Sequence, residues 1–364
     1  MATTADPRVL ESLQDTTDAR RAAVNEFMNA DEPTANVVGV ADGIKYRSGE
    51  PTGDQALLVF VTQKLDENDL PPEHRIPATY QDVQTDVVTV GPLFAEEFAA
   101  PQGASGCVGA ITNEVMPVAI TEPQLLRIRM RPASAGVSVG HVAITAGTLG
   151  SVVYDFLPGS GNTPPTIGVG IPPRYYILSN NHVLANTNRA QAGDPIVQPG
   201  PIDGGSAPTD VIAQLTRFVP IALNPPIPLN QHNNLVDAAI AEVEFQNADR
   251  RTYFGAVPRG WRPRANVNVG LLVKKTGRTT NFTTGRVIGV NGTFDINYRI
   301  GVGRFTNQLA LTNMSAGGDS GSLITTLDDV AVGLLYAGGP SVTIANHIQD
   351  VRAQLRIEIG EQIL

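Results

Sequence analysis

The chain has 364 residues, a formal net charge of -9 and a pI near 5.1. Its 42% hydrophobic and 17% charged residues provide enough apolar side chains for two or three domains of roughly 100 to 200 residues each, which excludes general disorder. The acidic balance argues against a nucleic acid or an anionic membrane surface as partner, because no segment supplies clustered Lys and Arg.

The cysteine content and the N-terminal residues indicate the cellular compartment of the protein. Cys107 is the single cysteine, so the chain cannot form an internal disulfide and its fold does not depend on an oxidising environment. The sequence begins Met-Ala-Thr-Thr without a charged and then apolar signal pattern, and no apolar run reaches the ~18 residues of a membrane span. We therefore expect a soluble, cytoplasmic protein without a membrane partner.

The first 98 residues predict a small α/β domain. Apolar residues recur at helical spacing over residues 9–30, and Pro33 ends that pattern because proline cannot continue a helix. Three apolar, β-branched runs come next, separated by Gly, Pro and Asp, at residues 37–47, 55–64 and 85–90. This pattern indicates a helix that covers one face of a three-stranded sheet, with a regulatory or pro-like role toward the C-terminal domain.

Residues 99–135 are predicted to be a connector, because Pro, Gly and Ala are concentrated near its start. Self-cleavage is expected to be sterically easiest over residues 99–106. From residue 136 onward short β-branched runs alternate with turn residues, which predicts a mainly β domain of two small barrels over 136–364, closed by a helix at 348–357. The predicted strands are residues 148–155, 175–179, 195–198, 211–218, 238–243, 267–274, 284–290, 295–300, 309–312, 321–325 and 330–336.

Two polar residues stand at unusual places in this β region. His182 comes after the apolar strand 175–179 and the polar pair Asn180-Asn181, so its imidazole would lie at the edge of a rigid sheet. Asp237 stands inside the apolar run 235–241, where a carboxylate is costly to bury unless it accepts hydrogen bonds or meets a partner charge. A histidine at a strand end is more often structural than catalytic, so neither residue alone indicates chemistry.

The segment 317–324 contains a candidate nucleophile. Ser320 lies on a turn of small residues, flanked by Gly318 and Gly321, and an apolar strand comes directly after it. Such a turn leaves room for a substrate backbone and can direct successive backbone N–H groups into one concavity. An attacking serine and its oxyanion hole require this geometry, although an ordinary Gly-Asp-Ser-Gly surface turn has the same sequence.

In the order His182, Asp237 and Ser320, the three clusters resemble the triad of the chymotrypsin-like serine peptidase superfamily. The run Leu178-Ser-Asn-Asn-His-Val183 is similar to the histidine segment of HtrA-type and other bacterial trypsin-like peptidases. The run Lys275-Thr-Gly-Arg-Thr-Thr280, together with residues 284–287, is similar to a hairpin in the second barrel of bacterial secreted members. The resemblance covers roughly residues 136–357.

The resemblance implies a serine endopeptidase that acts on protein or peptide substrates without a metal or an organic cofactor. Ser320 would attack the peptide carbonyl, His182 would accept and then return the proton, and Asp237 would orient the imidazole. The backbone N–H groups of Gly318 and Ser320 would form the oxyanion hole. No pair of histidines has the spacing of metal ligands.

The sequence departs from familiar relatives at two points. The activating Ile-Val-Gly-Gly start of trypsin-like zymogens is absent near residue 105, so Asp319 needs another partner or none. Met314 stands six residues before the nucleophile, where trypsin has the pocket-floor aspartate, and we expect an apolar or small residue at the P1 position of the substrate. The residues predicted to contact the substrate are Met314, Tyr336, Ala337 and Gly338.

Two alternative functions can be weighed against the sequence. An α/β-hydrolase elbow requires Gly-x-Ser-x-Gly, but Ser322 occupies the position of its second glycine, and the acid and histidine would have to come after the serine with strands and helices between them. That fold is excluded. A catalytically silent binding scaffold with the same barrels remains the alternative to an active peptidase.

Overall fold

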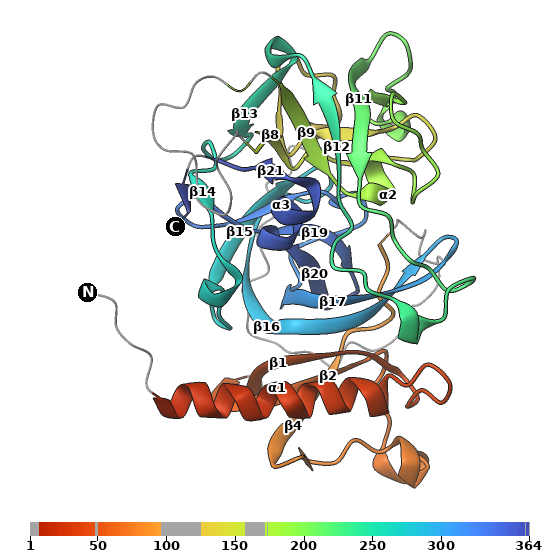
Figure 1. Cartoon of the computed structure of the whole chain (residues 1–364), viewed down its shortest axis with the longest axis vertical. Coiled ribbons are helices and arrows are strands. Elements are labelled where there is room, and N and C mark those ends of the chain that lie inside the picture. The colour runs from red at the N-terminus through yellow and green to blue at the C-terminus, as the bar shows by residue number, and fades with distance from the viewer. Residues whose placement is uncertain are drawn as a thin grey trace.

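The structure is a computed structural model that describes residues 7–47, 50–95, 125–156, 172, 174–360 and 362–363. Cys107 and the predicted self-cleavage segment, residues 99–106, lie outside these ranges. The described chain is mainly β, as predicted, and its strands form sheets of twelve, eight and two strands. Figure 1 shows the N-terminal helix and strands at one end of the molecule and the strands of the C-terminal half above them.

The N-terminal helix lies across strands that are near the predicted positions. Helix α1 (Pro7–Phe27) packs on β1 (Val37–Arg47), β2 (Glu50–Val61) and β4 (Val83–Thr89), with the short β3 (Thr79–Tyr80) beside β4. The buried side chains of Phe27 and Met28 meet Leu57 and Val59 from the sheet. Burial of such side chains stabilises the contact by about 1.5 to 3 kcal/mol each.

The N-terminal strands are continuous with a sheet of the C-terminal region. Strand β1 pairs antiparallel with β16 (Asn281–Tyr298), with Val40 opposite Thr293. Gly39 fits here because a Cβ at this position would lie 2.1 Å from the Phe294 ring. The boundary predicted near residue 98 therefore separates two stretches of sequence that share one hydrogen-bonded sheet.

Six strands of the C-terminal half form a closed ring through antiparallel pairing. In ring order they are β15 (Leu272–Gly277), β18 (Leu323–Thr326), β19 (Val330–Gly338), β20 (Val342–His347), β17 (Gly301–Thr312) and β16, which pairs again with β15. The ring lies within residues 136–364, for which two small barrels were predicted. Strand β20 was not predicted from the sequence, although all six of its residues are buried.

An eight-stranded sheet stands where the other barrel is predicted. Its order is β21 (Ile357–Glu358), β8 (Ser151–Asp155), β9 (Tyr175–Ser179), β12 (Ala239–Val243), β11 (Val211–Phe218), β10 (Pro195–Val197), β6 (Ser138–His141) and β7 (Gly147–Thr148). Strands β9 and β11 have the predicted bounds. The remaining helices and strands are α2 (Asn181–Leu184), α3 (Ile348–Leu355), β5 (Ala133–Ala135), β13 (Ala248–Thr252), β14 (Gly260–Trp261) and β22 (Gln362–Ile363).

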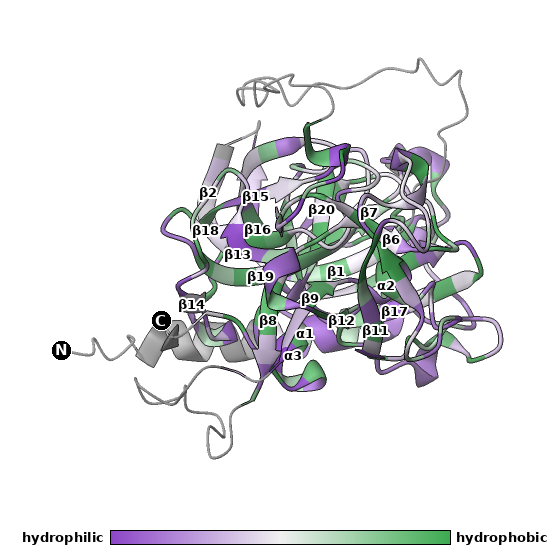
Figure 2. Cartoon of the chain, turned by 90° about the horizontal axis from the view of Figure 1, so that it is seen from above, coloured by the Kyte–Doolittle hydropathy of each residue, from purple (hydrophilic) through white to green (hydrophobic). Residues whose placement is uncertain are grey.

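The two large sheets are held together by a shared apolar core. It combines residues of β9 and β12 with residues of β19 and α3, among them Leu178, Ile240, Leu334 and Val351. Figure 2 shows apolar residues along these central strands and hydrophilic residues at the periphery. The shared core sets the relative positions of β9, β12 and β19, which carry or adjoin the residues of the candidate site.

Strand β16 is longer than predicted. The pattern favours separate strands at residues 284–290 and 295–300, because Asn-Gly commonly forms a turn. Instead β16 runs for 18 residues, and a bulge at Asn291, which has φ of 54°, shifts its register against β17. The Asp42 carboxylate accepts hydrogen bonds from Asn291 Nδ2 (2.9 Å) and Arg20 Nε (2.9 Å), which ties the bulge to α1.

None of the helices in the described part of the chain combines the length and the apolar character that crossing a membrane requires.

Candidate active site

His182 is positioned by the end of β9. The strand ends at Ser179, whose Oγ donates to Thr148 O (2.7 Å), and the four-residue helix α2 begins at Asn181. Asn180 Nδ2 donates to the backbone oxygen of Asp237 (2.7 Å). These bonds fix the short turn that carries His182, which is 6% exposed. The imidazole therefore lies beyond the end of β9, which is an inner strand of the eight-stranded sheet and not its edge, where the sequence had placed it.

Asp237 lies two residues before β12 and is fully buried. Its Oδ2 lies 2.6 Å from His182 Nδ1 and accepts a hydrogen bond from Tyr298 Oη (2.9 Å). Its Oδ1 accepts from the His182 backbone N–H (3.2 Å). Hydrogen bonds from three donors compensate for the free energy of desolvating the buried carboxylate. A carboxylate against Nδ1 selects the tautomer with the proton on that atom, which leaves Nε2 as the basic nitrogen of a neutral ring.

Ser320 lies on a turn that has room only for glycine at positions 318 and 321. Gly318 and Gly321 have φ of 91° and 96°, and a Cβ at Gly321 would lie 2.0 Å from Ser179 Oγ. The Ser320 backbone oxygen accepts from Thr148 N (2.8 Å). One cavity is lined by Ser320, Gly318 and His182. The structure thus pairs His182 with Asp237 directly and brings Ser320 to the same cavity as the imidazole.

The hydroxyl of Ser320 has a partner that no sequence pattern indicated. Ser320 Oγ donates a hydrogen bond to the backbone oxygen of Ala95 (3.1 Å), a residue of the N-terminal segment that also lines the cavity. A serine hydroxyl carries one proton, so this proton is directed at Ala95 and not at His182 in this conformation.

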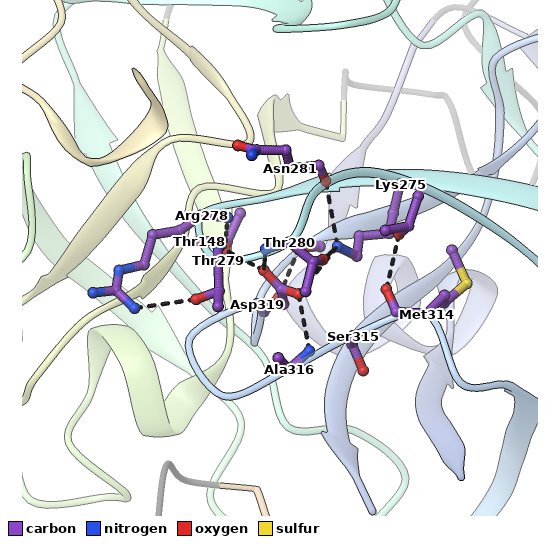
Figure 3. Close-up of polar contacts among 12 residues, drawn as sticks. Thr148, Lys275, Arg278, Thr279, Thr280, Asn281, Met314, Ser315, Ala316 and Asp319 are labelled. Carbon is purple, nitrogen blue, oxygen red and sulfur yellow. Dashed lines mark hydrogen bonds and ion pairs between the residues drawn. The ribbon is translucent and has the colours of Figure 1, made fainter. Parts of the chain in front are cut away.

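Asp319, next to Ser320, meets a buried cation. Its Oδ2 lies 3.1 Å from Lys275 Nζ on β15, and both side chains are fully buried. Figure 3 shows the further donors around this carboxylate, which are Thr279 N (2.8 Å), Thr280 N (3.1 Å), Thr280 Oγ1 (2.6 Å) and Ala316 N (3.0 Å). Burial lowers the pKa of Lys275, and the Asp319 charge opposes that shift. Lys275 is thus the partner of Asp319 that could not be named from the sequence.

The same hairpin holds the backbone of the serine turn. Thr279 Oγ1 donates to Gly317 O (2.7 Å), and Thr148 Oγ1 donates to Gly318 O (2.9 Å). The conformation of the residues around Ser320 therefore depends on the β15–β16 hairpin that carries Lys275 and on Thr148 of β7. Lys275 comes directly after the predicted strand 267–274, and no pattern in the sequence assigned it this role.

Three of the four residues that were predicted to contact the substrate have buried side chains. Met314 is 2% exposed and Tyr336 is fully buried, with its ring centroid 4.9 Å from that of Phe305. Burial, together with the Asp237 charge, raises the pKa of Tyr336 well above its ordinary value. Ala337 is 3% exposed. Gly338, the fourth, forms backbone hydrogen bonds with Phe94. None of the four lines the cavity that contains Ser320.

The other histidines of the β region do not line the cavity that contains Ser320. His347 caps α3, and burial, with a smaller effect from the charge of Arg264, lowers its pKa to about 3. His141 Nε2 lies 3.3 Å from Asp194 Oδ2, and His232 accepts from the Arg304 backbone N–H (3.1 Å). Within the described ranges, no three His, Cys, Asp or Glu side chains are grouped so that they could hold a metal ion.

Comparisons with known proteins found similarity only among solved structures. No family model matches the sequence, and no curated protein matches it. A glutamic acid-specific serine protease is 20% identical over 62% of this chain and 100% of its own, with a TM-score of 0.40. Thermobifida fusca protease A is 15% identical over 63% of this chain and 100% of its own, with a TM-score of 0.41.

Cellulomonas bogoriensis chymotrypsin is 14% identical over 63% of this chain and 99% of its own, with a TM-score of 0.41. At these scores the likeness assigns neither a family nor an activity.

Proposed function

We propose that the protein is a serine endopeptidase that hydrolyses peptide bonds through His182, Asp237 and Ser320. The observation that carries the proposal is the 2.6 Å contact between His182 Nδ1 and the buried Asp237 carboxylate, with Ser320 on the cavity that His182 lines. The order and local sequence of the three residues, which resemble chymotrypsin-like peptidases, support the same interpretation.

In the proposed mechanism Ser320 Oγ attacks the carbonyl carbon of the substrate while its proton passes to His182 Nε2. The tetrahedral intermediate collapses when the imidazolium donates that proton to the leaving amine, and an acyl-enzyme remains. Water, deprotonated by His182, then releases the acid product. Asp237 stabilises the imidazolium and stays ionised. The N–H groups of Gly318 and Ser320 would stabilise the oxyanion, and one such donor typically contributes ~3 kcal/mol.

The proposal includes a P1 preference for apolar or small side chains. Met314 stands six residues before Ser320, the sequence position at which trypsin has its pocket aspartate, and its buried thioether offers no charge to Arg or Lys. A pocket without a buried carboxylate gives basic residues no electrostatic advantage over apolar ones.

A catalytically silent scaffold is the second candidate, because the Ser320 hydroxyl donates to Ala95 O in this conformation. We expect the active form to prevail, since a scaffold has no need of a buried carboxylate that accepts two hydrogen bonds from His182.

Hydrolysis of a peptide library by wild type and by Ser320→Ala tests the proposal. We expect wild type to cleave after Ala, Val, Leu or similar residues and Ser320→Ala to cleave at none of these sites. Cleavage mainly after Arg or Lys would contradict the P1 assignment alone. Equal cleavage by both proteins would contradict the role of Ser320.

A further inference from the structure

The segment directly after β4 pairs with the edge of β19 in the manner of an added strand. Phe94 N donates to Gly338 O (3.0 Å), and Gly338 N donates to Phe94 O (3.0 Å). Phe94 and Gly338 thus form a hydrogen-bonded pair of the antiparallel type, and Gly338 is the last residue of β19. Addition of an extended peptide to a sheet edge is a general mode of peptide recognition.

The opposite edge of the same segment pairs with the end of β16. Ala95 N donates to Asn297 O (3.1 Å), and Asn297 N donates to Leu93 O (3.0 Å). Asn297 Nδ2 donates to the same Leu93 oxygen (3.0 Å). The next residue of β16 is Tyr298, which donates to Asp237. Residues 93–95 are therefore bound on both backbone edges, in a groove whose second wall adjoins the His182–Asp237 pair.

The segment reaches the nucleophile itself. Ala95 lines the cavity with His182 and Ser320, and its carbonyl oxygen accepts the Ser320 proton at 3.1 Å. Nucleophilic attack requires that this proton pass to the base. An extended backbone that pairs with β19 and ends at the serine hydroxyl occupies the place that a peptide substrate needs, and it holds the hydroxyl in an unproductive direction.

Apolar contacts anchor the segment. Leu93 is fully buried and Ala95 is 3% exposed, and both belong to a core cluster that includes Ala337 and Val342. Upstream, Val90 N donates to Val61 O (2.8 Å), which joins the segment to β2. Since β1 pairs with β16, the N-terminal strands and the groove are parts of one sheet, and the segment is held next to Ser320 at a high effective concentration.

We propose that residues 91–95 are a built-in occupant of the substrate groove between Gly338 and Asn297, and that the intact chain is thereby inhibited in cis. The groove would accept an extended peptide of apolar and small residues, as Leu93, Phe94 and Ala95 are. The inhibition rests on the proposed peptidase function, whereas the occupancy of the groove does not. Release of the segment frees both the groove and the Ser320 proton.

This inhibition is competitive, because residues 91–95 and a peptide substrate would occupy the same groove. If only a fraction of the molecules has an open groove, the apparent affinity for a peptide falls by that fraction, while a saturating peptide still captures every molecule. Loosening the segment should therefore lower KM and leave kcat unchanged. A residue with a merely structural role would change stability or kcat instead.

Ala95→Pro is the first test, because proline lacks the N–H that donates to Asn297 O. We expect kcat/KM for a cleaved peptide to rise at least about tenfold through KM. Ala95→Ser, which keeps the N–H and the small size, should behave as wild type. Asn297→Ala removes only the side-chain bond to Leu93 O and should raise kcat/KM by a smaller factor. Unchanged KM in folded Ala95→Pro and Asn297→Ala would overturn the inhibition.

A binding measurement tests occupancy without catalysis. In the Ser320→Ala background, a fluorescein-labelled peptide with the sequence of residues 90–97 is titrated by fluorescence anisotropy. We expect Ala95→Pro to bind it at least about tenfold more tightly than Ala95→Ser does. Equal affinity would overturn the occupied groove even if the protein is a peptidase. Tighter binding by a protein that hydrolyses nothing would uphold the groove and reject the peptidase.

Discussion

Asp237→Asn should fold and lose about four orders of magnitude in kcat, as such a change does in related geometry. An asparagine can retain one carbonyl oxygen, but its amide group is a donor and cannot accept the proton on His182 Nδ1. If the amide faces Nδ1, the imidazole is held in the tautomer that carries its proton on Nε2. That nitrogen then cannot accept the Ser320 proton. Steady-state hydrolysis of the best library peptide, with the melting temperature measured in parallel, checks this prediction.

Tyr298→Phe is the matched control for Asp237→Asn. It removes one hydrogen bond to Asp237 Oδ2 and leaves the carboxylate and its contacts with His182 intact. A hydrogen bond to a charged group contributes about 1.5 to 3 kcal/mol, so we expect a loss of roughly ten- to a hundredfold at most. An Asp237→Asn protein that keeps a tenth or more of the wild-type kcat would show that Asp237 does not control the imidazole.

Lys275→Met should destabilise the protein by about 3 to 5 kcal/mol, since it leaves the fully buried Asp319 carboxylate without its cation. Activity should fall as well, because the Asp319 network and the turn of Ser320 share the β15–β16 hairpin. Methionine approximates the length of the lysine side chain, so the loss reports the missing charge more than a missing volume. Chemical denaturation measures the change in the free energy of unfolding.

The double variant Lys275→Met, Asp319→Asn is the control for that change. It makes both members of the pair neutral, so no unpaired charge remains buried, and we expect it to recover a large part of the lost stability. If Lys275→Met unfolds at the wild-type denaturant concentration, the ion pair does not stabilise the fold. If the double variant is less stable than Lys275→Met, the buried charge is not the cause of the loss.

Local sequence patterns predicted the strands that lie between clear breaks. Strands β9 and β11 are short runs rich in apolar residues, bounded by polar or proline-containing stretches, and their predicted bounds match the structure. Strand β20 was missed because Asn346 and His347 resemble loop residues. In the structure Asn346 Oδ1 accepts from Asp237 N (3.0 Å), so its polarity is satisfied inside the core.

Pairing between distant segments could not be predicted from periodicity. No local pattern indicates that β1 pairs with β16, because the backbone donors and acceptors at the edge of a strand can pair with many other strands. The same limit applies to Asn291, which has the residues of a turn but forms a bulge that is fixed by Asp42 from the N-terminal region.

Only part of the candidate site could be predicted from the sequence, because the other part depends on contacts between distant segments. His182, Asp237 and Ser320 have recognisable surroundings in the sequence and a familiar order. The residues that complete the site do not: Tyr298 reaches Asp237 from the end of β16, Lys275 reaches Asp319 from β15, and Ala95 reaches Ser320 from the N-terminal segment. Each contact depends on how separate strands are brought together in three dimensions.

The most direct measurement is the reaction of the intact protein with a fluorophosphonate probe, with mass spectrometry of the modified peptide as the readout. If His182 and Asp237 activate Ser320, we expect modification of Ser320 alone, a strong reduction in Asp237→Asn, and a faster rate in Ala95→Pro than in wild type. A folded Ala95→Pro protein whose Ser320 stays unmodified would contradict the assignment of a catalytic triad.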